Sequence, residues 1–153
     1  MAAVQHVDAA GLKYKSGKNY KKYSGKKYTV YFEGNQVTSK KLYGIKLGDE
    51  LLVPYKKVIC KGMNIAAAKG RYKKTAIIAF VKGNKRVLFF LNNNVVVVNN
   101  TKKRINTAPR YCKIKKKVVY VPLDIVAETF GYTCDYYEAD AKVSVYKTAQ
   151  VKA

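Results

Sequence analysis

The sequence contains few acids, one histidine and no tryptophan. Nine Asp and Glu residues stand against 31 Lys and Arg residues, and the histidine is His6. A Ser–His–Asp arrangement, or a metal site built from several imidazoles, needs histidine inside the folded body, whereas His6 lies in a weakly patterned leader. We therefore expect no enzyme, no catalytic residue, no cofactor and no metal ligand in this chain.

Cysteine is also scarce, and its spacing matches no motif. Cys60, Cys112 and Cys134 contain no C-x-x-C pair of the kind found in metal knuckles and redox sites. The sequence favours three reduced thiols buried as small apolar residues, and it leaves open one disulfide with a leftover thiol. No apolar run approaches the roughly 20 residues of a membrane span, and no signal-peptide pattern stands at the N-terminus.

The charge that is present is positive and uneven. The net charge is +22, and residues 51–123 contain eighteen Lys or Arg and no acid. Such a field attracts polyanions, whether nucleic acid, anionic wall polymer, acidic glycan or lipid headgroup, unless it is only a solvated surface. Nucleic acid is the less expected partner, because 27 lysines outnumber four arginines and base contacts depend on arginine. The candidate polyanion-binding residues are Lys102, Lys103, Arg104, Lys115, Lys116 and Lys117.

Composition divides the chain into three parts. Residues 1–27 form a basic leader or linker rich in Lys and Tyr, residues 28–148 form the folded domain, and residues 149–153 form a short tail. The interleaved Lys and Tyr of residues 12–28 have the low complexity of a tether. The same pattern could stack on and neutralise a nucleic-acid strand, an alternative that we rank second.

The folded part reads as strands with two short helices. Runs rich in Val, Ile, Tyr and Phe between turn residues predict strands at 29–33, 36–38, 50–53, 66–68, 74–81, 86–91, 95–98, 104–106, 110–114, 117–121, 132–136 and 142–146. Turns are expected at 69–71 and 82–85. The fold class is therefore α+β, mostly antiparallel, with pseudo-repeated halves.

The pseudo-repeat rests on two Val-Pro segments. Pro54 and Pro122 each follow a strand and can occupy the first position of a helix, predicted at 54–62 and 122–130. Gly131 is a good stop for the second helix. We expect these helices to fill the interior and to leave no pocket with reactive groups. Their inner faces are predicted to present Tyr55, Val58, Ile59 and Gly62, and Leu123, Val126, Ala127 and Phe130.

The few acids have structural and functional interpretations. Asp124 and Glu128, predicted to face outward, are either a carboxylate pair or a complement to the helix dipole, and we favour the dipole. The acids of the last hairpin could hold calcium, but their spacing matches no calcium loop, so turn acids are favoured. They also offer an acidic patch to the basic body of a second copy; they are Asp135, Glu138 and Asp140.

Five segments together resemble a known family. They lie at 32–37, 51–54, 98–100, 108–109 and 119–131, and the last, Val-Tyr-Val-Pro-Leu-Asp-Ile-Val-Ala-Glu-Thr-Phe-Gly, is the most specific. Residues 28–148 resemble the stalk domain named after the N-terminal region of copper amine oxidase. In this resemblance Cys134 takes an apolar strand position and Tyr136 takes the place of the family's aromatic residue.

The resemblance implies a role without catalysis. In amine oxidases the copper belongs to a separate catalytic domain, and the stalk module recurs in secreted and wall-associated proteins of Gram-positive bacteria. It implies a secreted or cell-surface spacer that acts in adhesion or assembly, including self-association into filaments. The alternative is a polyanion-binding module whose Lys-rich surface holds anionic wall polymer or nucleic acid.

Overall fold

The two Val-Pro segments lie side by side at the centre of the molecule. In the computed structural model, which describes residues 25–106, 109–112 and 118–148, they end strands β4 (Glu50–Pro54) and β11 (Val118–Pro122). These strands pair antiparallel, with Val53 opposite Val121. Each leads directly into a helix, η2 (Lys56–Gly62, a π-helix) and α2 (Leu123–Thr129). That the two halves are related copies stays a prediction.

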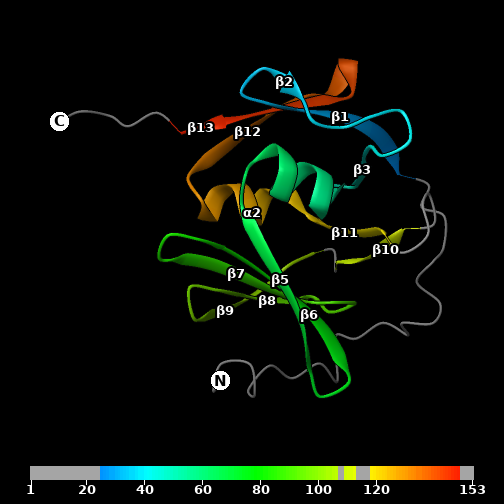
Figure 1. Ribbon diagram of the computed structural model, residues 1–153. Helices are drawn as coiled ribbons and strands as arrows, with labels where there is room; N and C mark the ends of the chain where they lie inside the picture. Colours follow the sequence, from blue (N-terminus) through cyan, green and yellow to red (C-terminus); the bar gives the residue numbers. More distant parts are fainter. Residues whose placement is uncertain (1–24, 107–108, 113–117, 149–153) are drawn as a thin grey trace.

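Two sheets enclose these helices (Figure 1). The larger sheet has the strand order β10-β11-β4-β3-β1-β13-β12, with β2 added to β1. The smaller sheet is an antiparallel meander in the order β5-β6-β7-β8-β9. The large-sheet strands not yet placed are β1 (Lys26–Phe32), β2 (Asn35–Gln36), β3 (Gly44–Leu47), β10 (Arg110–Cys112), β12 (Tyr132–Tyr137) and β13 (Lys142–Lys147). The small sheet comprises β5 (Ala66–Tyr72), β6 (Thr75–Lys82), β7 (Lys85–Phe90), β8 (Val95–Val98) and β9 (Thr101–Arg104).

The larger sheet is mixed because one internal pair, β1 with β13, is parallel. Strand β1 pairs parallel with β13, from Thr29 opposite Lys142 to Phe32 opposite Val145. The other strand pairs that the structure describes in both sheets are antiparallel. A 3-10 turn, η3 (Glu138–Asp140), joins β12 to β13. The fold is thus mostly strands in antiparallel and mixed sheets with two short helices, as the sequence predicts.

One apolar core joins both sheets and both helices. Val58, Ile59, Leu123 and Val126 are completely buried, and Phe130 packs at the edge of the same cluster. The predicted inner faces are therefore confirmed. From the small sheet, the rings of Phe80 and Phe89 meet edge to face, and that of Tyr55 meets Phe80 in the same way. Such rings contribute through buried area and through edge-to-face geometry.

Local chemistry explains where the helices begin and end. Pro122 precedes α2 in an extended conformation, Asp124 stands in its first turn, and Gly131 ends it at φ +86°. A carboxylate near the positive end of a helix is stabilising, and only glycine adopts that φ without strain. Helix η2 has no acid in its first turn and instead begins with Lys56 and Lys57.

Several strand predictions are corrected. The turn expected at 69–71 is wrong, because β5 continues to Tyr72 and the chain reverses at Lys73, whose φ is +56°. Gly70 lies inside the strand, opposite Ile77. Strand β3 was not predicted, and the strand expected at 104–106 is found at Thr101–Arg104. Strand β1 begins at Lys26, two residues before the expected domain boundary, and the rest of the predicted leader lies outside the described residues.

Candidate functional site

The described bases and acids are concentrated in different segments of the chain. Residues 66–104, which form the small sheet, contain ten Lys or Arg and no Asp or Glu. Residues 124–140, which form α2, β12 and η3, contain five acids and no Lys or Arg. Because charges of one sign on one sheet add their potentials, the small sheet presents a positive field over its whole width.

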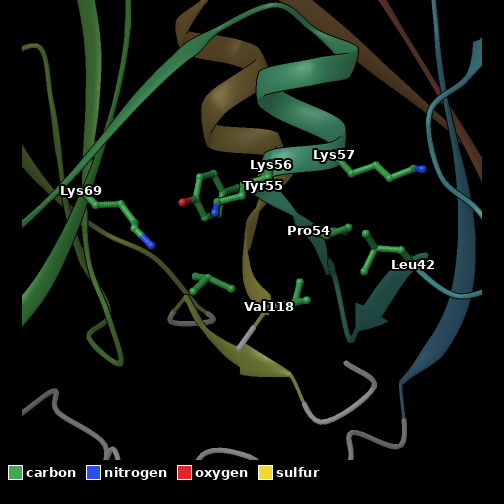
Figure 2. Close-up of a pocket in the computed structure, with 8 residues that line it drawn as sticks. Leu42, Pro54, Tyr55, Lys56, Lys57, Lys69 and Val118 are labelled. Atoms are coloured by element: carbon green, nitrogen blue, oxygen red, sulfur yellow. The ribbon is translucent and has the colours of Figure 1, made fainter. Parts of the chain in front are cut away.

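A pocket lies where this positive sheet meets the larger one. Its volume is about 220 Å³, and it is lined by Leu42, Pro54, Tyr55, Lys56, Lys57, Lys69, Val118 and Val119. Lys69 comes from β5, Lys56 and Lys57 from the start of η2, and the apolar side chains from β4, β11 and the loop before β3. Figure 2 shows Lys69 extending from the small sheet toward the pocket, with Lys57 on the opposite side.

The ammonium groups of the pocket lysines are available to bind a ligand. The side-chain ammonium groups of Lys56, Lys57 and Lys69 form no hydrogen bond or ion pair with another part of the chain that the structure describes. Each ammonium group has three donors and no acceptor, so anionic oxygens are its natural partners. Three lysines therefore line the pocket above an apolar floor, and in Figure 2 Lys57 extends away from Lys69. Lys56 and Lys69 are exposed, so the pocket opens at the surface, and its polar groups are ammonium and phenol groups and not an acid paired with a base.

Three of the predicted polyanion-binding residues lie together on β9. Lys102, Lys103 and Arg104 are exposed on this edge strand. Lys102 is opposite Val97 and Arg104 opposite Val95, while Lys103 is opposite Val96. Directly paired residues share a face of the sheet, so Lys103 projects to the face opposite the other two. The other predicted residues, Lys115, Lys116 and Lys117, lie outside the described residues.

The pocket lysines were missed as a site from the sequence. The Lys56–Lys57 pair is visible there as an unfavourable start to a helix, which is a signal that these charges have another use. Lys69 gave no signal, because it was placed in a turn. Only the pairing of β4 with β11 and the position of β5 bring these residues to one cavity.

The carboxylates are used within the fold. Asp124 is half-buried and accepts a hydrogen bond from the hydroxyl of Tyr136, so the prediction that it faces outward is wrong. Glu128 is exposed, as expected. Burial, reinforced by the hydrogen bond to Asp124, raises the pKa of the Tyr136 hydroxyl. Burial, reinforced by the Asp124 charge, also raises the pKa of the Cys134 thiol. A phenol and a thiol whose ionised forms are disfavoured are poor nucleophiles.

The acids of the last hairpin have protein partners. Glu138 forms an ion pair with Lys46 at 3.1 Å, and Asp135 accepts a hydrogen bond of 2.6 Å from the hydroxyl of Tyr146. The ammonium group of Lys46 also lies 4.8 Å from the ring centroid of Tyr136, a cation–π distance. Among the residues that the structure describes, no group of three or more His, Cys, Asp or Glu side chains is placed to hold a metal ion.

Two cysteines can be placed. Cys60 and Cys134 are free thiols and half-buried, so the prediction of reduced thiols is confirmed for this pair, while full burial is not. Burial raises the pKa of the Cys60 thiol, against the opposing influence of the Lys56 charge. The side chain of Cys112 lies outside the described set. Within the described ranges, no helix has both the length and the hydropathy needed to cross a bilayer.

Comparison with known proteins identifies the family. Residues 17–145 match the family model described as the copper amine oxidase N-terminal domain, and the chain belongs to this family. The match covers most of the chain and agrees with the resemblance expected for residues 28–148. Neither the curated proteins nor the solved structures contain a match to the chain. Membership in this family suggests a non-catalytic module.

Proposed function

We propose that this member of the copper amine oxidase N-terminal domain family is a stalk and interaction module at the surface of a Gram-positive cell. It spaces and joins other parts of a surface protein and catalyses no reaction. Two observations support this proposal: the family match, and the engagement of half-buried polar side chains in hydrogen bonds within the fold. Tyr136, Asp124 and Glu138 hydrogen-bond to one another or to lysine within the fold, as expected of a scaffold.

Localisation and assembly test this proposal. The chain, expressed in a Gram-positive host with its native flanking sequence, is expected in the wall fraction and accessible to antibody on intact cells. The purified chain is examined over a range of concentrations by sedimentation velocity, because self-association depends on protomer concentration. A protein confined to the cytoplasmic fraction, with no self-association and no surface partner, contradicts the proposal.

A second function, polyanion binding, is favoured by one observation. The pocket is lined by three lysines that have no ion-pair partner among the residues the structure describes, next to a sheet that contains ten basic residues and no acid. We propose that this surface binds an anionic polymer such as the phosphate-rich polymers of the Gram-positive wall. A stalk that also binds wall polymer would be held within the wall by electrostatic attraction.

Salt dependence is the direct test of polymer binding. Poly(glycerol phosphate) is titrated into the chain at low and at moderate salt, with neutral dextran as control. Each phosphate contact releases condensed counterions, so affinity is expected to fall by about tenfold or more between 50 mM and 200 mM salt. Absence of binding at low salt, or equal binding of dextran, contradicts this function. Tighter binding of single-stranded DNA than of the wall polymer would identify nucleic acid as the partner.

Two variants of equal charge change locate the surface. Lys56→Gln/Lys57→Gln/Lys69→Gln removes the pocket charges, and Lys102→Gln/Lys103→Gln/Arg104→Gln removes the β9 charges. If the pocket is the centre of binding, the first variant loses several-fold more affinity than the second. Equal losses of affinity would show that binding depends on the net charge of the protein and not on a particular site. Lys57 is half-buried and the other five side chains are exposed, so both variants are expected to keep their fold.

A further inference from the structure

The chain enters and leaves the large sheet through neighbouring parallel strands. Strand β1 is the first described strand and β13 the last, and they pair directly although Thr29 and Lys142 are 113 positions apart. Because the pair is parallel, Lys26 begins β1 at one end of it and Lys147 ends β13 at the other. Figure 1 shows both strands running in the same direction across the larger sheet. We call this pair, Lys26–Phe32 with Lys142–Lys147, the terminal clamp.

We infer that the terminal clamp makes the domain resist tension applied along the chain. Tension that pulls at Lys26 and at Lys147 acts along the strands, in opposite directions on the two members of the pair. The interstrand hydrogen bonds then share the load and must break together. In a hairpin, tension at the open end separates the bonds one at a time, so each breaks under the full load.

The hydrogen bonds of the clamp extend along its length. At one end the amide N–H of Thr29 donates to the carbonyl of Ala141 at 3.0 Å, and at the other the amide of Glu33 donates to Val145 at 2.9 Å. The carboxylate of Glu33 adds a further link, accepting a bond of 2.7 Å from the amide of Lys147. The load is therefore distributed from Thr29 to Lys147.

Water has little access to the inner side of the clamp. Val30, Val143 and Val145 are completely buried in the core beneath the paired strands. A water molecule that replaces a strained hydrogen bond needs access to it, so burial on this side slows rupture. Breaking the clamp also exposes these three valines to water, which adds an unfavourable hydrophobic contribution to rupture.

Neither strand of the clamp can detach from an edge. Strand β13 is paired over six residues with β12 on its far side, and β1 is paired with β3 and β2 on its own far side. The clamp is therefore internal to the order β3-β1-β13-β12. A strand held on both sides must break two ladders to leave, unlike an edge strand.

Single-molecule force spectroscopy with two anchoring geometries tests the inference. In the first, anchors at Lys26→Cys and Lys147→Cys load the clamp along its strands. In the second, anchors at Lys27→Cys and Asp140→Cys lie at one end of the pair and open it sequentially. All four anchor side chains are exposed, so the fold is the same and only the direction of load changes. The native cysteines are changed to alanine; should that background fail to fold, click-reactive amino acids at the same four sites replace the anchors.

The expected result is a mean unfolding force higher by about twofold or more for the first geometry at equal loading rate, because forced unfolding follows the barrier along the pulled direction. Equal forces, or a higher force in the second geometry, would overturn the inference. The biological use of the clamp rests on the proposed stalk function, but the force ratio does not. Polymer binding by both anchored variants, measured separately, shows whether the proposed binding function fails on its own.

Discussion

Replacing Glu50 by glutamine is expected to stabilise the domain at neutral and alkaline pH. Glu50 opens β4 opposite Leu47 and is half-buried. Its burial, followed by the charges of Asp124 and Asp49, raises the pKa of the carboxyl group from its ordinary value of 4.5 to about 7. The folded protein therefore holds this proton more tightly than the unfolded chain does. Between pH 4.5 and 7 the native state binds more protons, so the free energy of unfolding falls as pH rises through this window.

The magnitude follows from the displacement of the pKa. A rise from 4.5 to about 7 corresponds to about 3 kcal/mol at 1.36 kcal/mol per pH unit. Because the side chain is only half-buried, solvent screening reduces the expected cost of the ionised carboxylate to about 1 kcal/mol. Glu50→Gln removes this cost above pH 7 and has little effect near pH 4.5, where Glu50 is largely protonated in the folded state. In a domain of this size 1 kcal/mol shifts Tm by about 2–4 °C.

Urea unfolding of the wild type and of Glu50→Gln at pH 5, 6, 7 and 8 measures this effect. The difference in unfolding free energy between the two proteins is expected to grow with pH and to level off above pH 7. Glu128→Gln, at an exposed position on α2, is the matched control and should show no such growth. A difference between wild type and Glu50→Gln that is independent of pH, or that shrinks as pH rises, refutes the reasoning.

Three further predictions concern the core and the pocket. Phe80→Ala removes a completely buried ring and is expected to cost about 3–5 kcal/mol, measured as the urea midpoint; a loss below 1 kcal/mol would contradict the core described here. Lys56→Glu places an acid in the first turn of η2 and should raise stability by about 0.3–1 kcal/mol in thermal melts while weakening polymer binding. Gly62→Ala puts a Cβ 2.9 Å from Cγ1 of Val37, so a cost of about 1–3 kcal/mol is expected, with partial recovery in the double variant with Val37→Ala.

Local signals in the sequence were sufficient for the second helix. The predicted range 122–130 agrees with the observed Leu123–Thr129, because Pro122, Asp124 and Gly131 each act within one turn of their own position. The hairpin between β6 and β7 was predicted for the same reason, since Gly83 adopts φ +63°.

Non-local pairing decided the features that the sequence did not predict. Strand β3 has only four residues and is defined by β1 on one side and β4 on the other. The parallel pairing of β1 with β13 connects segments 113 positions apart, for which neither periodicity nor turn residues give a signal. The pocket was missed for the same reason, because its lysines come from β5 and η2 and its floor from β4 and β11.

The pairing of β1 with β13 also governs when the domain can fold during synthesis. Strand β1 cannot complete its pairing until β13 has been synthesised, which requires more than a hundred further residues. Closing so long a loop is entropically costly and slows folding. The small sheet, whose strands follow one another as hairpins, can form earlier. A nascent chain halted before Lys142 is therefore expected to hold an incomplete larger sheet, open to proteases and chaperones, until its last strand arrives.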